Sequence, residues 1–201
     1  MQYNILSENN TSTVVAHYER PAMVADDGYQ TEADLERSLI EQLQRQGYEY
    51  AQIHNEDELI ANLRVKLEEL NNYHFTDNEW SSFFKTEIAS EGKGIIDKTR
   101  TIQTDFVKTL KCDNGEEKNI YLIKKDDVHA NRTQVINQYE VWNGKRPNRY
   151  DVSILVNGLP LVHIELKKRG VSIKEAFNQI NRYGRESFWA GNGLFEYVQI
   201  F

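Results

Sequence analysis

Two short segments joined by Asn157-Gly158 constrain the fold of this chain more than any other feature. Residues 152–156 and residues 162–166 carry apolar side chains at every second position. Side chains alternate between the two faces of a strand, so these apolar side chains must share one face of a sheet. They are Val152, Ile154, Val156, Val162, Ile164 and Leu166. Asn-Gly favours a two-residue turn between antiparallel strands, and the sequence therefore predicts a β-hairpin with one apolar face.

Three charged side chains, those of Asp151, Glu165 and Lys167, fall on the opposite face of this hairpin. Two carboxylates and an ammonium on one face could hold a hard divalent cation and polarise a phosphodiester for attack by water. The bland alternative is that acids and a lysine simply decorate the solvated face of an edge hairpin.

A simple two-residue turn would spoil this arrangement, because it would set Asp151 opposite Ile164. Burial of the apolar face and convergence of the charged groups both require an odd loop or a β-bulge. Pro160 lacks an N–H group and fits a strand start or a bulge. We therefore expect an irregular register that brings Asp151 close to Glu165.

A helix is predicted directly after the hairpin. Ser172 and Glu175 form a capping-box pattern, and apolar residues then recur at helical spacing until Gly184. The apolar positions are Ile173, Ala176, Phe177, Ile180 and Tyr183. Gln179 and Tyr183 are four residues apart and lie on one side of this helix. Packed on the sheet, the helix could aim them at the carboxylates, although Gln179 could equally be solvated and Tyr183 a core residue.

Together these residues resemble a known family. Asp151, the run Glu165-Leu166-Lys167, Gln179 and Tyr183 resemble the PD-(D/E)XK nuclease signature with its downstream Gln-xxx-Tyr element. Residues 148–183, with the capped helix near residues 31–47, closely resemble the amino-terminal endonuclease domain of the restriction (motor) subunit of type I restriction-modification enzymes. The resemblance covers most of the chain. Tyr150 replaces the nominal Pro before the Asp, a position that touches no metal.

The resemblance implies an α/β fold with a PD-(D/E)XK (restriction-endonuclease-like) core, in which helices flank a central mixed β-sheet. It implies that Asp151 and Glu165 bind Mg²⁺ and that Lys167 orients or activates the attacking water. Gln179 and Tyr183 would support the site or touch DNA. The implied partners are double-stranded DNA and the modification and specificity subunits. ATP would bind only in a translocase that follows, since this chain lacks a Gly-xxxx-Gly-Lys-Ser/Thr loop.

Two other functions remain open from the sequence. The chain could be a catalytically inert docking module of the same assembly, or a repair or junction-resolving nuclease with the same core.

Composition sets further bounds. About 200 residues with 39% hydrophobic residues suit a single endonuclease domain over residues 1–201. There is no signal peptide and no apolar run near 18 residues, so we expect no membrane segment. The single Cys112 points to a reducing, cytoplasmic location. The five His show no zinc-ligand spacing, and His163 is expected to be a hydrogen-bonding neighbour of Glu165.

Charge is unevenly distributed along the chain. The net charge is −7, which opposes binding to a polyanion. Residues 144–186 nevertheless hold nine Lys or Arg against four acids, a local charge of +5. We therefore expect weak intrinsic affinity for DNA, with another domain or subunit supplying most of the binding.

The first part of the chain is expected to be mainly helical cover. Residues 1–28 suggest an arm or edge strand, with a β-prone run at 13–18. Residues 29–147 would supply helical cover and the first strands, and residues 148–201 the catalytic hairpin, its helix and a last strand. The strand-like end at 195–201 suggests a fragment of a longer protein.

The expected elements before the hairpin are a capped helix from Thr31 to Gly47, a strand at 48–53, a helix at 59–70, a helix capped by Thr76 and Glu79, strands at 102–110, 120–123 and 134–141, and a turn at 113–115. Glu32 and Glu36 fall inside the apolar face of the first helix. A carboxylate there needs a partner or a metal. Glu36 is thus a candidate for the catalytic site, with a paired boundary glutamate as the favoured alternative.

Overall fold

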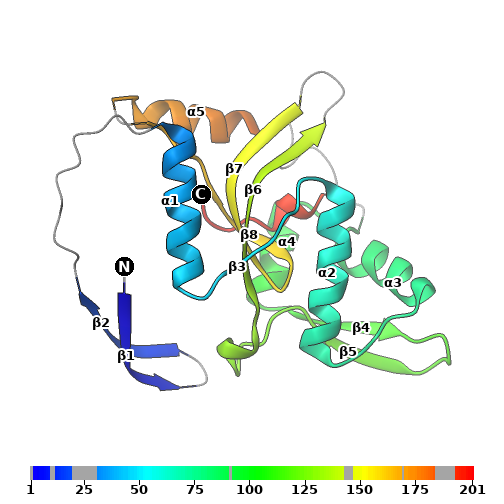
Figure 1. Cartoon of the computed structure of the whole chain (residues 1–201). Helices are drawn as coiled ribbons and strands as arrows, with labels where there is room; N and C mark the ends of the chain where they lie inside the picture. The colour runs from blue at the N-terminus through cyan, green and yellow to red at the C-terminus, as the bar shows by residue number, and fades with distance from the viewer. Residues whose placement is uncertain are drawn as a thin grey trace.

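A mixed four-stranded sheet lies at the centre of the molecule, with helices on both sides (Figure 1). The computed structural model describes residues 2–9, 12–19, 31–90, 92–142, 147–168, 170–183 and 193–201. The elements are, in order, β1 (Gln2–Asn9), β2 (Ser12–Glu19), α1 (Glu32–Arg45), β3 (Glu49–Tyr50), α2 (Glu56–Asn71), α3 (Asp77–Phe83), the π-helix η1 (Phe84–Ile88), α4 (Ile95–Gln103), β4 (Val107–Lys111), β5 (Glu117–Tyr121), the 3₁₀-helix η2 (Val128–Ala130), β6 (Thr133–Trp142), β7 (Pro147–Val156), β8 (Leu159–Ile164), α5 (Ile173–Tyr183) and the 3₁₀-helix η4 (Leu194–Tyr197).

The central sheet has the strand order β3-β6-β7-β8. β3 pairs with β6 in parallel, and the other neighbours are antiparallel. Ile200 forms a parallel bridge with Val162, so the carboxyl-terminal segment lies along β8. The expected α/β fold with a mixed sheet flanked by helices is confirmed.

The sheet is covered on both faces. Ile40 and Leu43 of α1 pack with Val135 and Val152 on one face. A larger cluster lies on the other face and includes the buried leucines of α2. Figure 1 shows α1 and α2 on opposite sides of the strands. The three leucines, Leu59, Leu63 and Leu67, are fully buried, and such burial contributes roughly 1.5–3 kcal/mol per side chain.

The helix caps predicted at Thr31 and Thr76 are present. The hydroxyl of Thr31 accepts a hydrogen bond from the amide of Asp34, and Thr76 forms a reciprocal capping box with Glu79. Gly47 follows α1 with a φ of +93°, a conformation that glycine adopts without strain.

Several predicted strands were wrong. Residues 102–110 begin as the end of α4, and the strand starts only at Val107. Ile102 is buried in the core, and a short apolar run does not distinguish a buried helix from a strand. Residues 195–197 belong to the 3₁₀-helix η4, whose four residues are all buried. Ile200 then forms a single bridge with Val162. The strand at 48–53 is only β3.

The expected strand at 13–18 lies within β2, whereas its antiparallel partner β1 was not predicted. The turn at 113–115 is confirmed, with Gly115 at a φ of +87° between β4 and β5. Within the described residues, no helix is both long enough and apolar enough to cross a bilayer.

Candidate active site

The β7–β8 hairpin combines a tight turn with a bulge. Asn157 and Gly158 both have positive φ, and Val156 pairs with Leu159 across them. The register then shifts, so that Ile154 pairs with Val162 and leaves Leu161 as the extra residue. This bulge follows Pro160 directly. The irregular register expected from the sequence is confirmed, because continuing it sets Asp151 opposite Glu165.

Asp151, Glu165 and Lys167 meet just beyond the last paired residue of β8. The Asp151 Oδ2 atom accepts a hydrogen bond of 2.9 Å from the backbone amide of Leu166. Lys167 Nζ donates to Glu165 Oε1 at 2.8 Å and to the Leu166 carbonyl oxygen at 2.9 Å. The predicted convergence of these three side chains is observed, and their catalytic and metal-binding roles remain predictions.

The two carboxylates have opposite pKa shifts. Burial raises the pKa of Asp151 to about 6, and the neighbouring Glu165 adds to this effect. Burial also acts to raise the pKa of Glu165, but His163 and Lys167 outweigh it and hold that pKa below its usual value. Burial lowers the pKa of Lys167, yet Glu165 beside it raises the pKa overall. Glu165 is therefore an anion and Lys167 a cation at neutral pH.

His163 supports Glu165 from the paired part of β8. Its side chain is fully buried, and Nδ1 lies 3.2 Å from the hydroxyl of Ser153. Its Nε2 is 3.5 Å from Glu165 Oε2, an ion-pair distance without hydrogen-bond geometry. His163 is thus a neighbour of Glu165, as expected, but this contact is not the expected hydrogen bond.

Helix α5 brings Gln179 and Tyr183 to the base of this group. The amide of Gln179 donates to the hydroxyl of Tyr183, which donates to the carbonyl oxygen of Arg149 at 2.8 Å. Tyr183 is buried, and its ring lies 4.9 Å from that of Tyr150. The pair thus holds the strand that leads into Asp151. Phe177, expected on the apolar face of this helix, is instead 63% exposed.

The glutamates of α1 have separate partners. Both carboxylate oxygens of Glu36 accept hydrogen bonds from the side-chain amides of Asn137 and Gln138 on β6. The favoured alternative, a paired glutamate, is thus confirmed for Glu36. Glu32 accepts a hydrogen bond of 3.3 Å from the backbone amide of Lys168 and acts to raise the pKa of Lys167. In the sequence, only the position of Glu32 inside the apolar face of the helix indicated that this carboxylate has a partner.

The expectation of one apolar and one open face needs correction. Val152 and Ile154 do pack under α1, as predicted. The opposite face is also buried, because Ser153, Leu155 and His163 are almost completely inaccessible. Only the end of the hairpin is left for the charged group. The cause is the second layer of helices, which covers the face that carries the acids.

The site suits a hard cation by its donor chemistry. Both acids offer carboxylate oxygens, and the buried Glu165 Oε2 accepts no hydrogen bond from any described residue. Mg²⁺ is commonly held by one or two carboxylates with water completing the shell. No group of three or more His, Cys, Asp or Glu with metal-binding geometry occurs among the described residues. Asp151 and Glu165 would supply side-chain ligands to such an ion.

The basic residues predicted around the acids are only partly described. Arg149, Lys174 and Arg182 are exposed, and Lys167 and Lys168 are half-buried beside the carboxylates. Lys145, Arg146, Arg169 and Arg185 lie outside the described residues, as does Gly184, the expected end of α5.

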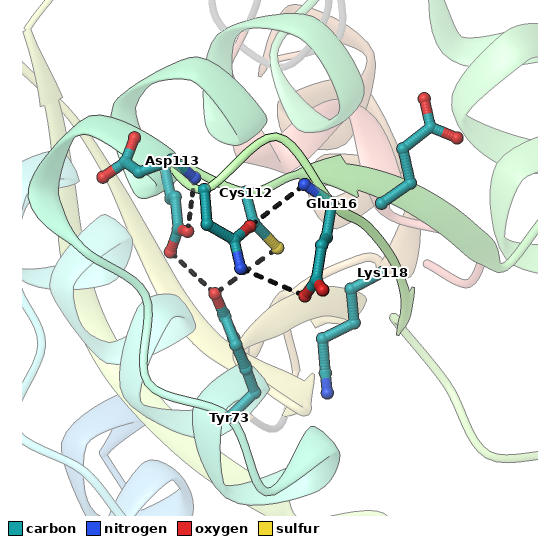
Figure 2. Close-up of a pocket in the computed structure, with 8 residues that line it drawn as sticks. Tyr73, Cys112, Asp113, Glu116 and Lys118 are labelled. Atoms are coloured by element: carbon teal, nitrogen blue, oxygen red, sulfur yellow. Dashed lines mark hydrogen bonds between the residues drawn. The ribbon is translucent and has the colours of Figure 1, made fainter.

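A pocket of about 390 Å³ lies elsewhere, between the loop after α2 and the β4–β5 hairpin (Figure 2). Its polar groups satisfy one another. The hydroxyl of Tyr73 donates to Glu79 at 2.9 Å and lies 3.6 Å from Cys112 Sγ, and Glu79 also accepts from the amide of Asp113. None of its lining residues belongs to β7, β8 or α5, and we assign it no role in the chemistry.

The chain is similar to known proteins over most of its length. The family model described as type I restriction enzyme R protein N terminus matches residues 29–201. The chain is 46% identical over 197 residues to the type I restriction enzyme EcoprrI endonuclease subunit of Escherichia coli, covering 98% of this chain and 62% of that protein. It is 42% identical over 180 residues to the SsaAORF53P endonuclease subunit of Staphylococcus saprophyticus, covering 86% of this chain and 18% of that protein.

The similarity extends at a lower level to the HindI endonuclease subunit of Haemophilus influenzae, with 27% identity over 178 residues. The chain thus spans less than two thirds of each of these relatives. The match to the family model covers most of the chain and includes every element of the site. The chain therefore belongs to the family of type I restriction enzyme R protein amino-terminal regions.

Proposed function

We propose that this chain is a Mg²⁺-dependent endonuclease domain that hydrolyses phosphodiester bonds in double-stranded DNA within a type I restriction enzyme. The observation that carries the proposal is the meeting of Asp151, Glu165 and Lys167 at the end of the β7–β8 hairpin. The printed names of the relatives, which are endonuclease subunits, support the same reaction class.

Asp151 and Glu165 would hold the ion. Bound Mg²⁺ would supply positive charge that polarises the phosphate and lowers the pKa of a coordinated water. The site is suited to this role, because a buried carboxylate oxygen of Glu165 has no hydrogen-bond donor among the described residues. Burial raises the pKa of Asp151 and the charge of Glu165 adds to this effect, and a bound cation would offset both.

Lys167 would stabilise negative charge that develops on the phosphate and orient the attacking water. Its raised pKa keeps the ammonium protonated at neutral pH, which suits it for electrostatic stabilisation and not for taking a proton. The contacts to Glu165 and the Leu166 carbonyl fix the ammonium before substrate arrives. Such prior ordering is what makes a fixed charge effective in a transition state.

Gln179 and Tyr183 would support the site. Their hydrogen bonds run to each other and to the backbone of Arg149, two residues before Asp151. Arg149 on β7 and Arg182 on α5 are exposed and would contact the DNA backbone.

The rest of the enzyme would supply what this chain lacks. Selection of unmodified DNA would come from modification and specificity subunits, and ATP-driven translocation from a motor segment of the intact subunit. The net charge of −7 fits a domain that relies on other parts of the complex to hold DNA.

Plasmid cleavage by the intact, assembled enzyme tests the proposal. Asp151→Ala and Lys167→Ala should each reduce Mg²⁺-dependent cleavage by about 100-fold or more while assembly persists. Asp126→Ala and Lys85→Ala change exposed residues outside the hairpin and should cleave normally. Normal cleavage by the two site variants would instead identify a docking module. Cleavage independent of ATP and of DNA modification would identify a repair nuclease.

A further inference from the structure

Gln138 on β6 has an unusual backbone conformation directly across from Asp151. Its φ is +53°, in the left-handed region that residues other than glycine rarely adopt. β6 and β7 pair Asn137 with Val152 and Tyr139 with Tyr150, and the ladder skips the position between them. That position holds Gln138 on one strand and Asp151 on the other.

In both strands, the alternation of side chains between the two faces of the sheet inverts at this position. On β6, Val135 packs with α1 and Asn137 bonds to Glu36 of α1, whereas Tyr139 lies in the opposite core cluster. Residues two apart in a regular strand point to the same face, so the alternation inverts between residues 137 and 139.

The inversion is matched on β7. Val152 packs with α1, whereas Tyr150 lies in the cluster on the other side. Because Tyr139 and Tyr150 remain paired across the strands, with ring centroids 6.0 Å apart, the two strands switch together. The switch point on β7 is Asp151 itself.

The switch has a direct effect on the candidate site. Asp151 leaves the β6–β7 ladder and its Oδ2 accepts the hydrogen bond from Leu166. The ring of Tyr150 lies beneath the site, with its centroid 5.3 Å from that of the His163 ring and 4.9 Å from that of the Tyr183 ring.

We propose that Gln138 is a positioning residue: its left-handed backbone inverts the faces of β6 and β7 and so turns Asp151 towards Leu166 and Glu165. The proposal rests on the proposed function only in taking Asp151 as a metal ligand. Strained backbone of this kind persists where surrounding contacts hold it, and it gathers at functional sites.

Glu36 is the group that holds this conformation. One carboxylate oxygen accepts from Asn137 at 2.5 Å, and the other accepts from the amide of Gln138. Asn137 is itself fixed by a hydrogen bond of 2.8 Å from the hydroxyl of Tyr50. With both oxygens bonded to amides, Glu36 would act on the site through Gln138.

Three substitutions separate backbone conformation from side-chain chemistry. The valine in Gln138→Val is β-branched and disfavours positive φ, whereas the glycine in Gln138→Gly allows positive φ without a side chain. As a control, Glu140→Val places valine at an exposed position of the same strand. If Gln138→Val does not fold, Gln138→Ala takes its place. The first measurement is hydrogen exchange of the Leu166 amide in the metal-free 201-residue chain.

We expect Leu166 to exchange at least tenfold faster in Gln138→Val and at a rate within about threefold of wild type in Gln138→Gly and Glu140→Val. The amide of His163, which bonds to the Ile200 carbonyl oxygen, should stay protected in all of them and reports an intact sheet. Calorimetric titration with Ca²⁺ should show the same order, with an affinity loss of tenfold or more only in Gln138→Val.

The outcomes are distinct. Wild-type exchange and Ca²⁺ affinity in Gln138→Val would overturn the positioning role, and so would an equal loss in Gln138→Gly, which would assign the effect to the side chain. If Asp151→Ala binds Ca²⁺ as well as wild type, the proposed metal site fails. In that case the exchange of Leu166 still decides whether Gln138 orients Asp151.

Discussion

At the scale of the residue, Asp151 combines its proposed role as a metal ligand with a cost to stability. Its carboxylate is buried next to another acid, and burial raises its pKa to about 6. An acid whose pKa is higher in the folded state than in the unfolded chain favours folding when protonated. That contribution is lost as the pH rises from about 4 through 6. The same crowding of negative charge is what a bound cation would offset.

Asp151→Asn should therefore stabilise the metal-free chain at pH 7.5, because it removes the buried charge and keeps an acceptor for the Leu166 amide. We expect a melting temperature a few degrees above wild type at that pH and no difference at pH 4. Thermal unfolding in EDTA across this pH range checks the prediction. Added Ca²⁺ should stabilise wild type alone. A variant that is less stable than wild type at pH 7.5 contradicts the assignment.

Tyr183, unlike Asp151, stabilises the fold, because its hydroxyl links α5 to the part of β7 that precedes Asp151. Tyr183→Phe keeps the buried ring and removes the hydrogen bonds to Arg149 and Gln179. It should lower the free energy of unfolding by about 1 kcal/mol and reduce cleavage without abolishing it. Urea denaturation and plasmid cleavage are the measurements. Complete loss of cleavage in a stable variant would indicate a direct role for the hydroxyl.

At the scale of the element, the β7–β8 hairpin is fixed by its docking on α2. A Cβ atom on Gly158 would lie 2.6 Å from the Leu63 Cα atom, and the φ of Gly158 is +84°. The turn therefore requires glycine both for its conformation and for the close approach of two backbones. The register that aligns Asp151 with Glu165 begins at this turn.

Gly158→Ala should lower the free energy of unfolding by about 2–4 kcal/mol, because backbone strain and a steric clash combine. Gly115→Ala is the matched control: its φ is +87°, but nothing lies within 4 Å of the added Cβ atom. Its cost should be about 1 kcal/mol from strain alone. Urea denaturation of both variants measures the difference, and equal costs would show that contact with α2 is unimportant.

At the scale of the whole molecule, the uneven charge bears on the proposed binding of DNA. The chain carries a net charge of −7, while the sequence segment 144–186, which contains Asp151 and Glu165, carries +5. Attraction is therefore confined to the site, and the remaining surface repels the polyanion. This distribution favours cleavage of DNA that another part of the enzyme has already bound.

The isolated chain should accordingly bind duplex DNA with a Kd above roughly 10 µM at 150 mM salt. The affinity should fall further as salt rises, since only the few cations near the site release counterions. Fluorescence anisotropy in Ca²⁺ over a salt series tests this. Tight, salt-insensitive binding would show that the acidic surface does not limit affinity.

The sequence by itself determined the hairpin, its need for a bulge and the helix caps at Thr31 and Thr76, because these depend on alternation, turn chemistry and short-range hydrogen bonds. It also placed Asp151, Glu165 and Lys167 on one face. Only the tertiary structure decided that both faces of the sheet are covered and that residues 102 and 195–197 are helical. Short apolar segments take the conformation that long-range packing gives them. The tertiary structure also decided the inversion at Gln138. No local sequence pattern indicates a left-handed glutamine there, because its conformation is held by Glu36, which lies 102 positions earlier in the chain.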